Sequence, residues 1–324
     1  MIENLLIYTA KGTNPYENLA LEQYMLETLQ PGQVILYLWQ NAHTVVIGKN
    51  QNAWAECRVS LLEEDGGKLA RRLSGGGAVY HDLGNLNFTF IANDQDYDLD
   101  KQLSVIVEAC GLAGIHAEKS GRNDLLAEGR KFSGNAFYHH NGRSYHHGTL
   151  LITSDMEKLQ KYLSPPKAKL AAKGVSSVRS RVVNLSELAP GLTCAAMARF
   201  MRQAFSKVYG METKEYTVAD EEAVAALTAK NRSWDHLFGA PLPFSFECRK
   251  YFPWGFVQLQ LNTDKGVVQA VKLYTDAMDW SLSEKTEQAL TGCKFKQADM
   301  ITALFKALPK EQATDMAALL SEHL

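Results

Sequence analysis

The sequence is poor in the features that mark secreted, zinc-binding and membrane proteins. Its five cysteines are far apart in a chain of 324 residues and form no CxxC pair, so they suggest neither a disulfide framework nor a thiolate zinc site. The chain has no apolar run of about 18 residues, and its N-terminal segment carries an acidic residue where an export signal would be basic. We therefore expect a cytoplasmic protein that does not enter a membrane.

An excess of charge of either sign is also missing. The chain has 34 basic and 36 acidic residues, which gives no reason to expect general binding to nucleic acid. Its length favours two domains, and its 46% hydrophobic content is that of a globular protein. The character changes past Pro241 and Pro243, so we expect domains at 1–245 and 246–324. The second region has no cluster with obvious chemistry and reads as a lid, docking or stability module.

Helices and strands are interspersed along the sequence. Asn14, Pro15 and Glu17 have the types and spacing of a helix start, and this helix should run to about residue 29. Apolar residues recur at helical spacing after residue 99, whereas those at 86–90 alternate as in a strand. The other expected elements are strands at 36–39, 45–48, 131–138, 145–152, 256–261 and 267–274 and helices at 194–209 and 220–230.

The most informative stretch is RRLSGGGAVYHD at residues 71–82. Glycine permits positive φ and can present successive N–H groups to a phosphate, and an adjacent arginine adds a permanently charged, forked donor. The stretch therefore predicts an anion site next to a strand. Taken alone, a plain tight hairpin explains the glycines equally well.

A second segment, AKLAAKGVSSVRSR, is basic, rich in small residues and without a clear period. This profile is typical of a mobile loop that closes on an anion. A solvated basic loop is the simpler alternative.

Three further motifs follow the glycine stretch: GRND at 121–124, GRKFSGNA at 129–136 and HHGTLL at 146–151. With these motifs and KGVSSVRSRVVNL at 173–185, the sequence resembles the lipoate–protein ligase A family along essentially the whole chain. The resemblance implies an α+β fold of the biotin/lipoate ligase type, with a mixed sheet and a core like that of class II synthetases. A small α/β accessory domain would follow.

The resemblance also implies a two-step reaction. Lipoate and ATP would give lipoyl-adenylate and pyrophosphate, and the adenylate would then acylate a lysine of an acceptor. The implied substrates and cofactors are (R)-lipoate, ATP and Mg²⁺. The implied acceptors are lipoyl domains of 2-oxoacid dehydrogenase E2 subunits and the glycine cleavage H protein. We expect residues 167–185 to be disordered without ligand and to become ordered over the adenylate.

The family pattern assigns roles to particular residues of this sequence. Lys131 is the leading catalytic candidate, because it would contact both ATP and the lipoyl carbonyl and stay protonated beside phosphate. The implied ATP and adenylate residues are Arg72, Gly77, Ala78, Val79, Tyr80, Asn85, Asp124 and Lys131. The implied lipoate residues are Glu22, Gly75, Gly76, Val79, Lys131 and His147.

Several of these residues have simpler interpretations. Asp124 is the magnesium candidate, since Mg²⁺ prefers carboxylate and phosphate oxygens, but an aspartate after Asn123 also suits a turn. His146 and His147 are adjacent on an expected strand and should point to opposite faces, which disfavours a metal pair. Glu22 alone would be an ordinary helix residue.

Three other functions share parts of this pattern. An ATP-independent octanoyl or lipoyl transferase would use a cysteine nucleophile, but the sequence has no cysteine between Gly111 and Thr193. A biotin ligase would have a different glycine-rich loop. A binding protein that had lost catalysis is disfavoured by the presence of Arg72, Asp124 and Lys131.

Overall fold

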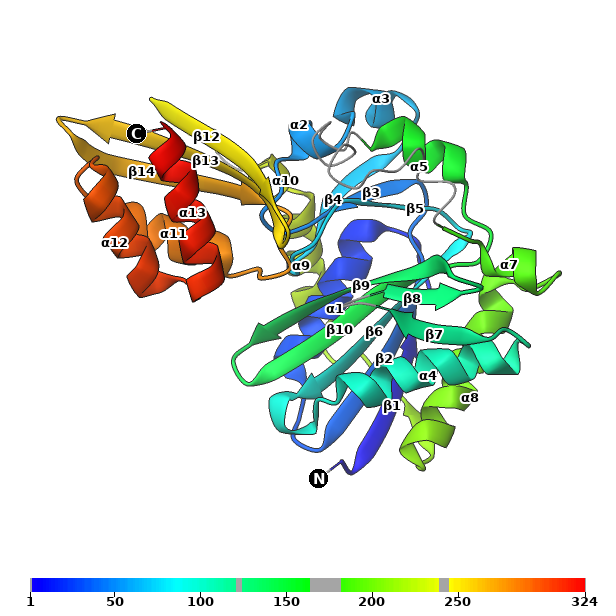
Figure 1. The fold of residues 1–324 in the computed structure, drawn as a ribbon. Helices are drawn as coiled ribbons and strands as arrows, with labels where there is room; N and C mark the ends of the chain where they lie inside the picture. Colours follow the sequence, from blue (N-terminus) through cyan, green and yellow to red (C-terminus); the bar gives the residue numbers. More distant parts are fainter. Residues whose placement is uncertain (1, 121–123, 164–181, 239–244, 324) are drawn as a thin grey trace.

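The structure is a computed structural model and describes residues 2–120, 124–163, 182–238 and 245–323 (Figure 1). Its central sheet comprises β1 (Asn4–Thr9), β2 (Gln33–Trp39), β6 (Asn85–Asn93), β7 (Ala117–Ser120), β8 (Asp124–Ala127), β9 (Arg130–His140), β10 (Arg143–Leu151) and β11 (Thr213–Glu215). The eight strands lie in the order β11-β1-β2-β6-β10-β9-β8-β7. β1 runs parallel to β11 and β2, and the other neighbours are antiparallel, so the sheet is mixed.

Helices cover both faces of this sheet (Figure 1). Alternate residues of β2 enter two different cores. Val34, Leu36 and Leu38 lie in the core that contains α4 (Leu99–Leu112) and α8 (Cys194–Tyr209). Ile35, Tyr37 and Trp39 lie in the core that contains α1 (Pro15–Thr28) and α9 (Glu221–Arg232). The predicted start of α1 is confirmed, because the side chain of Asn14 accepts a hydrogen bond from the Tyr16 N–H at 3.4 Å.

A second, small sheet presents the glycine stretch. It contains β3 (Thr44–Ile47), β4 (Lys68–Arg71) and β5 (Val79–His81) in the order β4-β3-β5. Because β4 and β5 flank β3, the glycine loop, residues 72–78, must cross the end of β3. It crosses over Gly48, where an added Cβ would lie 2.3 Å from the Gly76 carbonyl oxygen. The short helices α2 (Ala53–Glu56), α3 (Val59–Glu64) and α5 (Met156–Tyr162) lie near this sheet (Figure 1).

The C-terminal region has a sheet and a core of its own. The antiparallel strands β12 (Phe246–Phe252), β13 (Gly255–Asp264) and β14 (Val267–Thr275) pack against α11 (Leu282–Leu290), α12 (Gln297–Ala307) and α13 (Lys310–His323). The remaining elements are a 3-10 helix η1 (Asp94–Asp96), α7 (Leu185–Leu188) and α10 (Trp234–Phe238).

The α+β fold with a mixed sheet is as predicted, but the strand pairing is not visible in the sequence. The strands expected at 36–39 and 45–48 belong to different sheets, and β1, β4, β7, β8, β11 and β12 were not expected. The basic segment AKLAAKGVSSVRSR lies outside the described residues. Residues 239–244 also lie outside them, so the domain boundary near residue 245 stays a prediction. Among the helices that the structure describes, none is long and apolar enough to cross a membrane.

Candidate functional site

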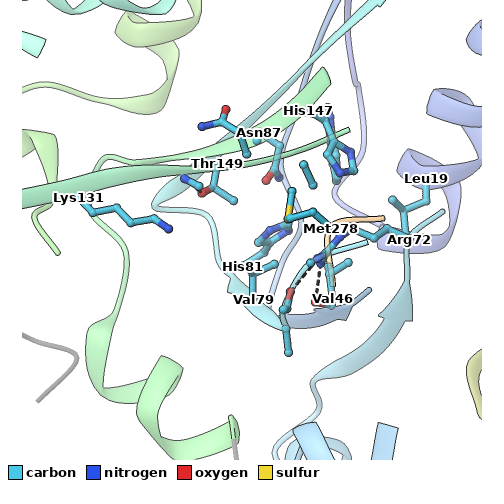
Figure 2. Close-up of a pocket in the computed structure, with 18 residues that line it drawn as sticks. Leu19, Val46, Arg72, Val79, His81, Asn87, Lys131, His147, Thr149 and Met278 are labelled. Carbon is cyan, nitrogen blue, oxygen red and sulfur yellow. Dashed lines mark hydrogen bonds between the residues drawn. The ribbon is translucent and has the colours of Figure 1, made fainter. Parts of the chain in front are cut away.

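A cavity of about 210 Å³ lies between the central sheet, the glycine loop and a segment of the C-terminal region (Figure 2). Its apolar side chains are those of Leu19, Trp39, Val46, Ala78, Val79, Ala136 and Met278. Its polar side chains include those of Arg72, His81, Asn87, Lys131, His147 and Thr149. Figure 2 shows Lys131 alone at one end of the cavity, and Leu19, Arg72 and His147 toward the other. The cavity therefore joins a largely apolar chamber to a partly exposed ammonium group.

Arg72 follows β4 and holds the glycine loop in shape. Its Nη2 donates to the carbonyl oxygens of Gly75 and Gly77, both at 2.7 Å, and its Nε donates to Ser74 Oγ at 3.0 Å. These partners are neutral, so they do not cancel the charge. Burial lowers the pKa of Arg72 to about 10, which leaves it protonated at neutral pH. The loop therefore carries a buried positive charge beside the cavity.

Gly75 and Gly76 permit a close approach of the C-terminal region. The Gly76 N–H donates to the Ala277 carbonyl oxygen at 3.1 Å, and Gly76 has a φ of 86°. A Cβ on Gly75 would lie 2.4 Å from the same oxygen. Gly76 lines the cavity, whereas Gly75 is not among its lining residues.

Two residues that follow Ala277, Met278 and Trp280, extend this contact. Met278 lines the cavity directly. Trp280 packs against Tyr138 with ring centroids 4.9 Å apart, and Lys49 Nζ lies 4.3 Å from its ring centre. The C-terminal region therefore forms one wall of the cavity, and its sequence did not indicate which residues would do so.

Glu22 and His147 form a buried pair behind the cavity wall. His147 Nδ1 lies 2.8 Å from Glu22 Oε1, which also accepts a hydrogen bond from Thr89 Oγ1 at 2.7 Å. The other ring nitrogen, Nε2, lies 2.7 Å from Ser74 Oγ, which connects the pair to the glycine loop. His147 lines the cavity, and Glu22 orients it from behind without lining the cavity itself.

His146 and His147 point to opposite faces of β10, as predicted. His146 Nε2 lies 2.8 Å from Asn135 Oδ1, and the ring packs between Phe88 and Phe90 in the core. Burial lowers the pKa of His146 to about 3, so it is neutral at physiological pH. The two histidines therefore do not form a metal pair.

Lys131 and Asp124 meet at the open end of the cavity. Lys131 Nζ lies 2.6 Å from Asp124 Oδ1, and each side chain is a little more than one-third exposed. A register shift between Leu125 and Leu126 marks a bulge where β8 pairs with β9, and bulges commonly redirect side chains. Gly134, opposite Asp124, leaves room for the lysine: a Cβ there would lie 3.2 Å from Lys131 Nζ.

The other predicted residues differ in their placement. Gly77, Ala78 and Val79 line the cavity. The Tyr80 ring turns to the other face of β5 and packs against Tyr162, with ring centroids 5.7 Å apart, so only the Tyr80 backbone is near the loop. Asn85 is buried outside the cavity lining, where its Nδ2 donates to Asn87 Oδ1 at 2.8 Å.

Sequence reasoning missed several lining residues. His81 and Asn87 both line the cavity. His81 belongs to the glycine motif at residues 71–82, so the motif could have indicated it, whereas Asn87 lies within a predicted strand that gave no such indication. Met278 gave no such signal, because it is far along the chain. Within the ranges that the structure describes, no group of three or more His, Cys, Asp or Glu side chains could hold a metal ion.

Comparison with known families matches both regions of the chain. Residues 14–206 match the family model of the lipoyl protein ligase A/B catalytic domain. Residues 242–318 match the family model of the bacterial lipoate protein ligase C-terminus.

Solved structures show the same similarity. The chain is 27% identical to P. falciparum LipL1, solved in complex with lipoate, with a TM-score of 0.86 over 97% of this chain and 98% of that one. It is 26% identical to a chain of the bi-partite lipoate protein ligase from Thermoplasma acidophilum, described with its E2 lipoyl domain; the TM-score is 0.66 over 76% of this chain and 100% of that one. A lipoate-protein ligase A bound with ATP is 25% identical, with a TM-score of 0.64 over 74% of this chain and 99% of that one.

Proposed function

The chain belongs to the lipoyl protein ligase A/B family, and from this premise we propose that it is an ATP-dependent lipoate–protein ligase. It would convert (R)-lipoate and ATP to lipoyl-adenylate and then transfer the lipoyl group to a lysine of a lipoyl domain. The observation that carries the proposal is the cavity, which joins an apolar chamber to the Lys131 ammonium beside a glycine loop. Such a cavity suits a molecule with an apolar chain and an anionic end. Relatives solved with lipoate and with ATP support the same substrates.

In the first step, a carboxylate oxygen of lipoate would attack the α-phosphorus of ATP and pyrophosphate would leave. Two anions must approach each other, so positive charge has to lie beside both. Lys131 would supply this charge at the open end of the cavity, and Arg72 would supply it beneath the glycine loop. The N–H groups of the segment from Gly77 to Tyr80 would contact the phosphates.

In the second step, the amine of the acceptor lysine would attack the acyl carbonyl, AMP would leave with the electron pair of the broken C–O bond, and the proton lost by the amine would pass to solvent. Lys131 would polarise that carbonyl by its positive charge rather than act as a base. The apolar chain would lie along Val79 and beside His147, whose orientation Glu22 fixes through the 2.8 Å contact.

Magnesium would enter as the complex with ATP. Asp124 is a single carboxylate at the phosphate end, which suits an ion that commonly takes one or two carboxylates together with substrate phosphates and water. Asp124 would thus hold the ion when nucleotide is bound, in competition with its present partner, Lys131.

We also propose acceptors and a division of the chain. The lipoyl domains of 2-oxoacid dehydrogenase E2 subunits are supported by the relative described with its E2 lipoyl domain. The glycine cleavage H protein would be a second acceptor, and the reaction would take place in the cytoplasm. The catalytic domain would end near residue 245.

Lipoate-dependent release of pyrophosphate from ATP tests the first step. We expect release when lipoate, ATP and Mg²⁺ are all present and none when lipoate is omitted or biotin replaces it. Equal release with biotin, or no release together with ATP-independent acyl transfer from a thioester donor, would contradict the proposal.

A further inference from the structure

His81 carries a buried nitrogen that faces the cavity side of β5 without a partner. The side chain lines the cavity and is 3% exposed. Its Nδ1 lies 3.2 Å from Asn41 Nδ2. Among the residues that the structure describes, its Nε2 has no hydrogen-bond partner. A buried polar atom with no partner beside a cavity points to a ligand group that would complete it.

A chain of hydrogen bonds fixes which nitrogen of His81 carries the proton. The Gln40 carbonyl oxygen can only accept, so the Asn18 atom 2.8 Å away must be its amide nitrogen. That same nitrogen donates to Asn41 Oδ1 at 3.0 Å. The Tyr37 hydroxyl, 3.3 Å from Asn18 Oδ1, is consistent with this orientation.

The orientation of Asn41 then sets the tautomer. With its oxygen facing Asn18, Asn41 presents its NH₂ group to His81 Nδ1, which must accept. Nε2 of the neutral ring therefore carries the hydrogen. Burial, with Arg72 and His147 nearby, lowers the pKa of His81 to about 3, so the ring is neutral at physiological pH. His81 is thus a neutral donor with one N–H available to a ligand.

The walls around this donor are mostly apolar. Val79, Trp39 and Met278 line the same cavity, and the Trp39 ring meets the His81 ring edge to face, with centroids 6.0 Å apart. An acyl chain made only of methylenes would cover the N–H without pairing it, which costs free energy. A chain with a sulfur acceptor at that depth would pair it, although sulfur accepts weakly.

We propose that His81 determines specificity by donating its Nε2–H to the dithiolane sulfur of the acyl chain, with Asn41 as the residue that positions it. This proposal rests on the proposed ligase function and extends it, because it predicts discrimination between lipoate and octanoate. Both acids have the same carboxylate and the same eight-carbon chain, so discrimination between them depends on contacts with the dithiolane.

Two substitutions at His81 differ only in which ring nitrogen they replace. The amide nitrogen of glutamine can occupy the place of Nε2, so His81→Gln keeps a donor in the cavity. Asparagine reaches only to the place of Nδ1, so His81→Asn keeps an acceptor for Asn41 but places no donor at the position of Nε2. The experiment measures kcat/KM for lipoate and for octanoate in competition, with ATP, Mg²⁺ and an apo lipoyl domain.

The ratio of the two kcat/KM values is the readout. We expect His81→Asn to lower the lipoate preference about fivefold, as for loss of one weak hydrogen bond, and His81→Gln to retain it. An unchanged ratio in His81→Asn, including equal losses with both acids, would overturn the proposal. If the wild-type chain used neither acid, the proposed function itself would fail, which distinguishes the two failures.

A measurement on the unsubstituted chain does not depend on how the variants fold. In a histidine-¹⁵N-labelled sample, the Nε2–H resonance of His81 should be visible and should shift more with lipoate than with octanoate. A proton on Nδ1 instead, or equal shifts with both acids, would contradict the proposal.

Discussion

Lys131 Nζ and Asp124 Oδ1 lie 2.6 Å apart at the open end of the cavity, so the leading catalytic candidate is paired before any substrate is bound. The pair is partly exposed, and such pairs contribute only about 0–1 kcal/mol to stability. It is therefore free to separate when phosphate approaches. The lysine would then turn to the anions, and the aspartate would become available to a cation.

Replacing Lys131 separates catalysis from stability. We expect Lys131→Ala to lower kcat/KM for adenylate formation by at least about 100-fold, because a preorganised charge at the reacting groups is lost. The free energy of unfolding should change by less than about 1 kcal/mol. Lipoate-dependent pyrophosphate release and chemical denaturation measure the two effects.

Lys119 provides a matched control for this change. Its Nζ pairs with Asp100 at 2.7 Å, with a similar lysine exposure, but neither residue lines the cavity. Lys119→Ala should leave activity unchanged. Equal losses of activity in the two variants would show that Lys131 has no specific role in catalysis.

Asp124→Asn tests the role of the carboxylate toward magnesium. The substitution removes the charge but keeps the size, so the fold should persist. We expect the Mg²⁺ concentration for half-maximal activity to rise about tenfold, as is typical when a metal site loses a supporting group. A magnesium titration identical to that of the unsubstituted chain would show that Asp124 does not hold the ion.

Gly75→Ala should disturb the contact between the glycine loop and the C-terminal region. The new Cβ would lie 2.4 Å from the Ala277 carbonyl oxygen, which is backbone and cannot rotate away. We expect a loss of roughly 1–3 kcal/mol in the free energy of unfolding, as for overpacking. The Gly76 amide, bonded to Ala277, should also lose protection from hydrogen exchange.

Gly111→Ala is the control for this variant. An added Cβ there meets nothing within 4 Å, and the residue lies inside α4. Because alanine favours a helix over glycine, this variant should be more stable by about 0.5–1 kcal/mol. Gly75→Ala with unchanged exchange at Gly76 would refute the packing argument.

The buried histidines predict a loss of stability in acid. Burial lowers the pKa values of His81 and His146 to about 3 in the folded chain, against 6.5 unfolded. Between these values the unfolded state binds more protons, so stability falls as pH decreases from about 6.5 toward 3. Each histidine contributes at most about 1.4 kcal/mol per pH unit.

The His146→Gln variant isolates one of these contributions. Denaturation of both proteins at several pH values from 7 to 4 should give a smaller dependence on pH in the variant, whatever its absolute stability. An identical slope in the variant would show that His146 is not the titrating group.

The sequence was most informative where one motif carries both the structure and the chemistry. The glycine loop, Lys131 and His147 could be placed near one another by resemblance, and Val79 indeed lines the cavity. The hydrogen bonds between Ser74 and His147 and between Asn41 and His81 could not be predicted in this way. Each joins residues that are at least 40 positions apart in the sequence. Such contacts depend on strand order and register, which periodicity alone does not determine.

Met278 is a second example of a contact that the sequence could not predict. It reaches the cavity because the C-terminal region packs closely on the glycine loop, where an added Cβ on Gly75 would lie 2.4 Å from the Ala277 carbonyl oxygen. Nothing in the residues around Met278 indicates this contact. The motif at residues 71–82 explains why the loop contains glycines, but it does not indicate which segment of the chain covers them.

Mass spectrometry of an apo lipoyl domain tests the central claim most directly. The domain is incubated with this protein, lipoate, ATP and Mg²⁺, and in parallel without ATP and with the Lys131→Ala variant. We predict that each domain gains one lipoyl group on a lysine, only in the complete mixture with the unsubstituted protein. No gain in the complete mixture, or an equal gain without ATP, would contradict the account.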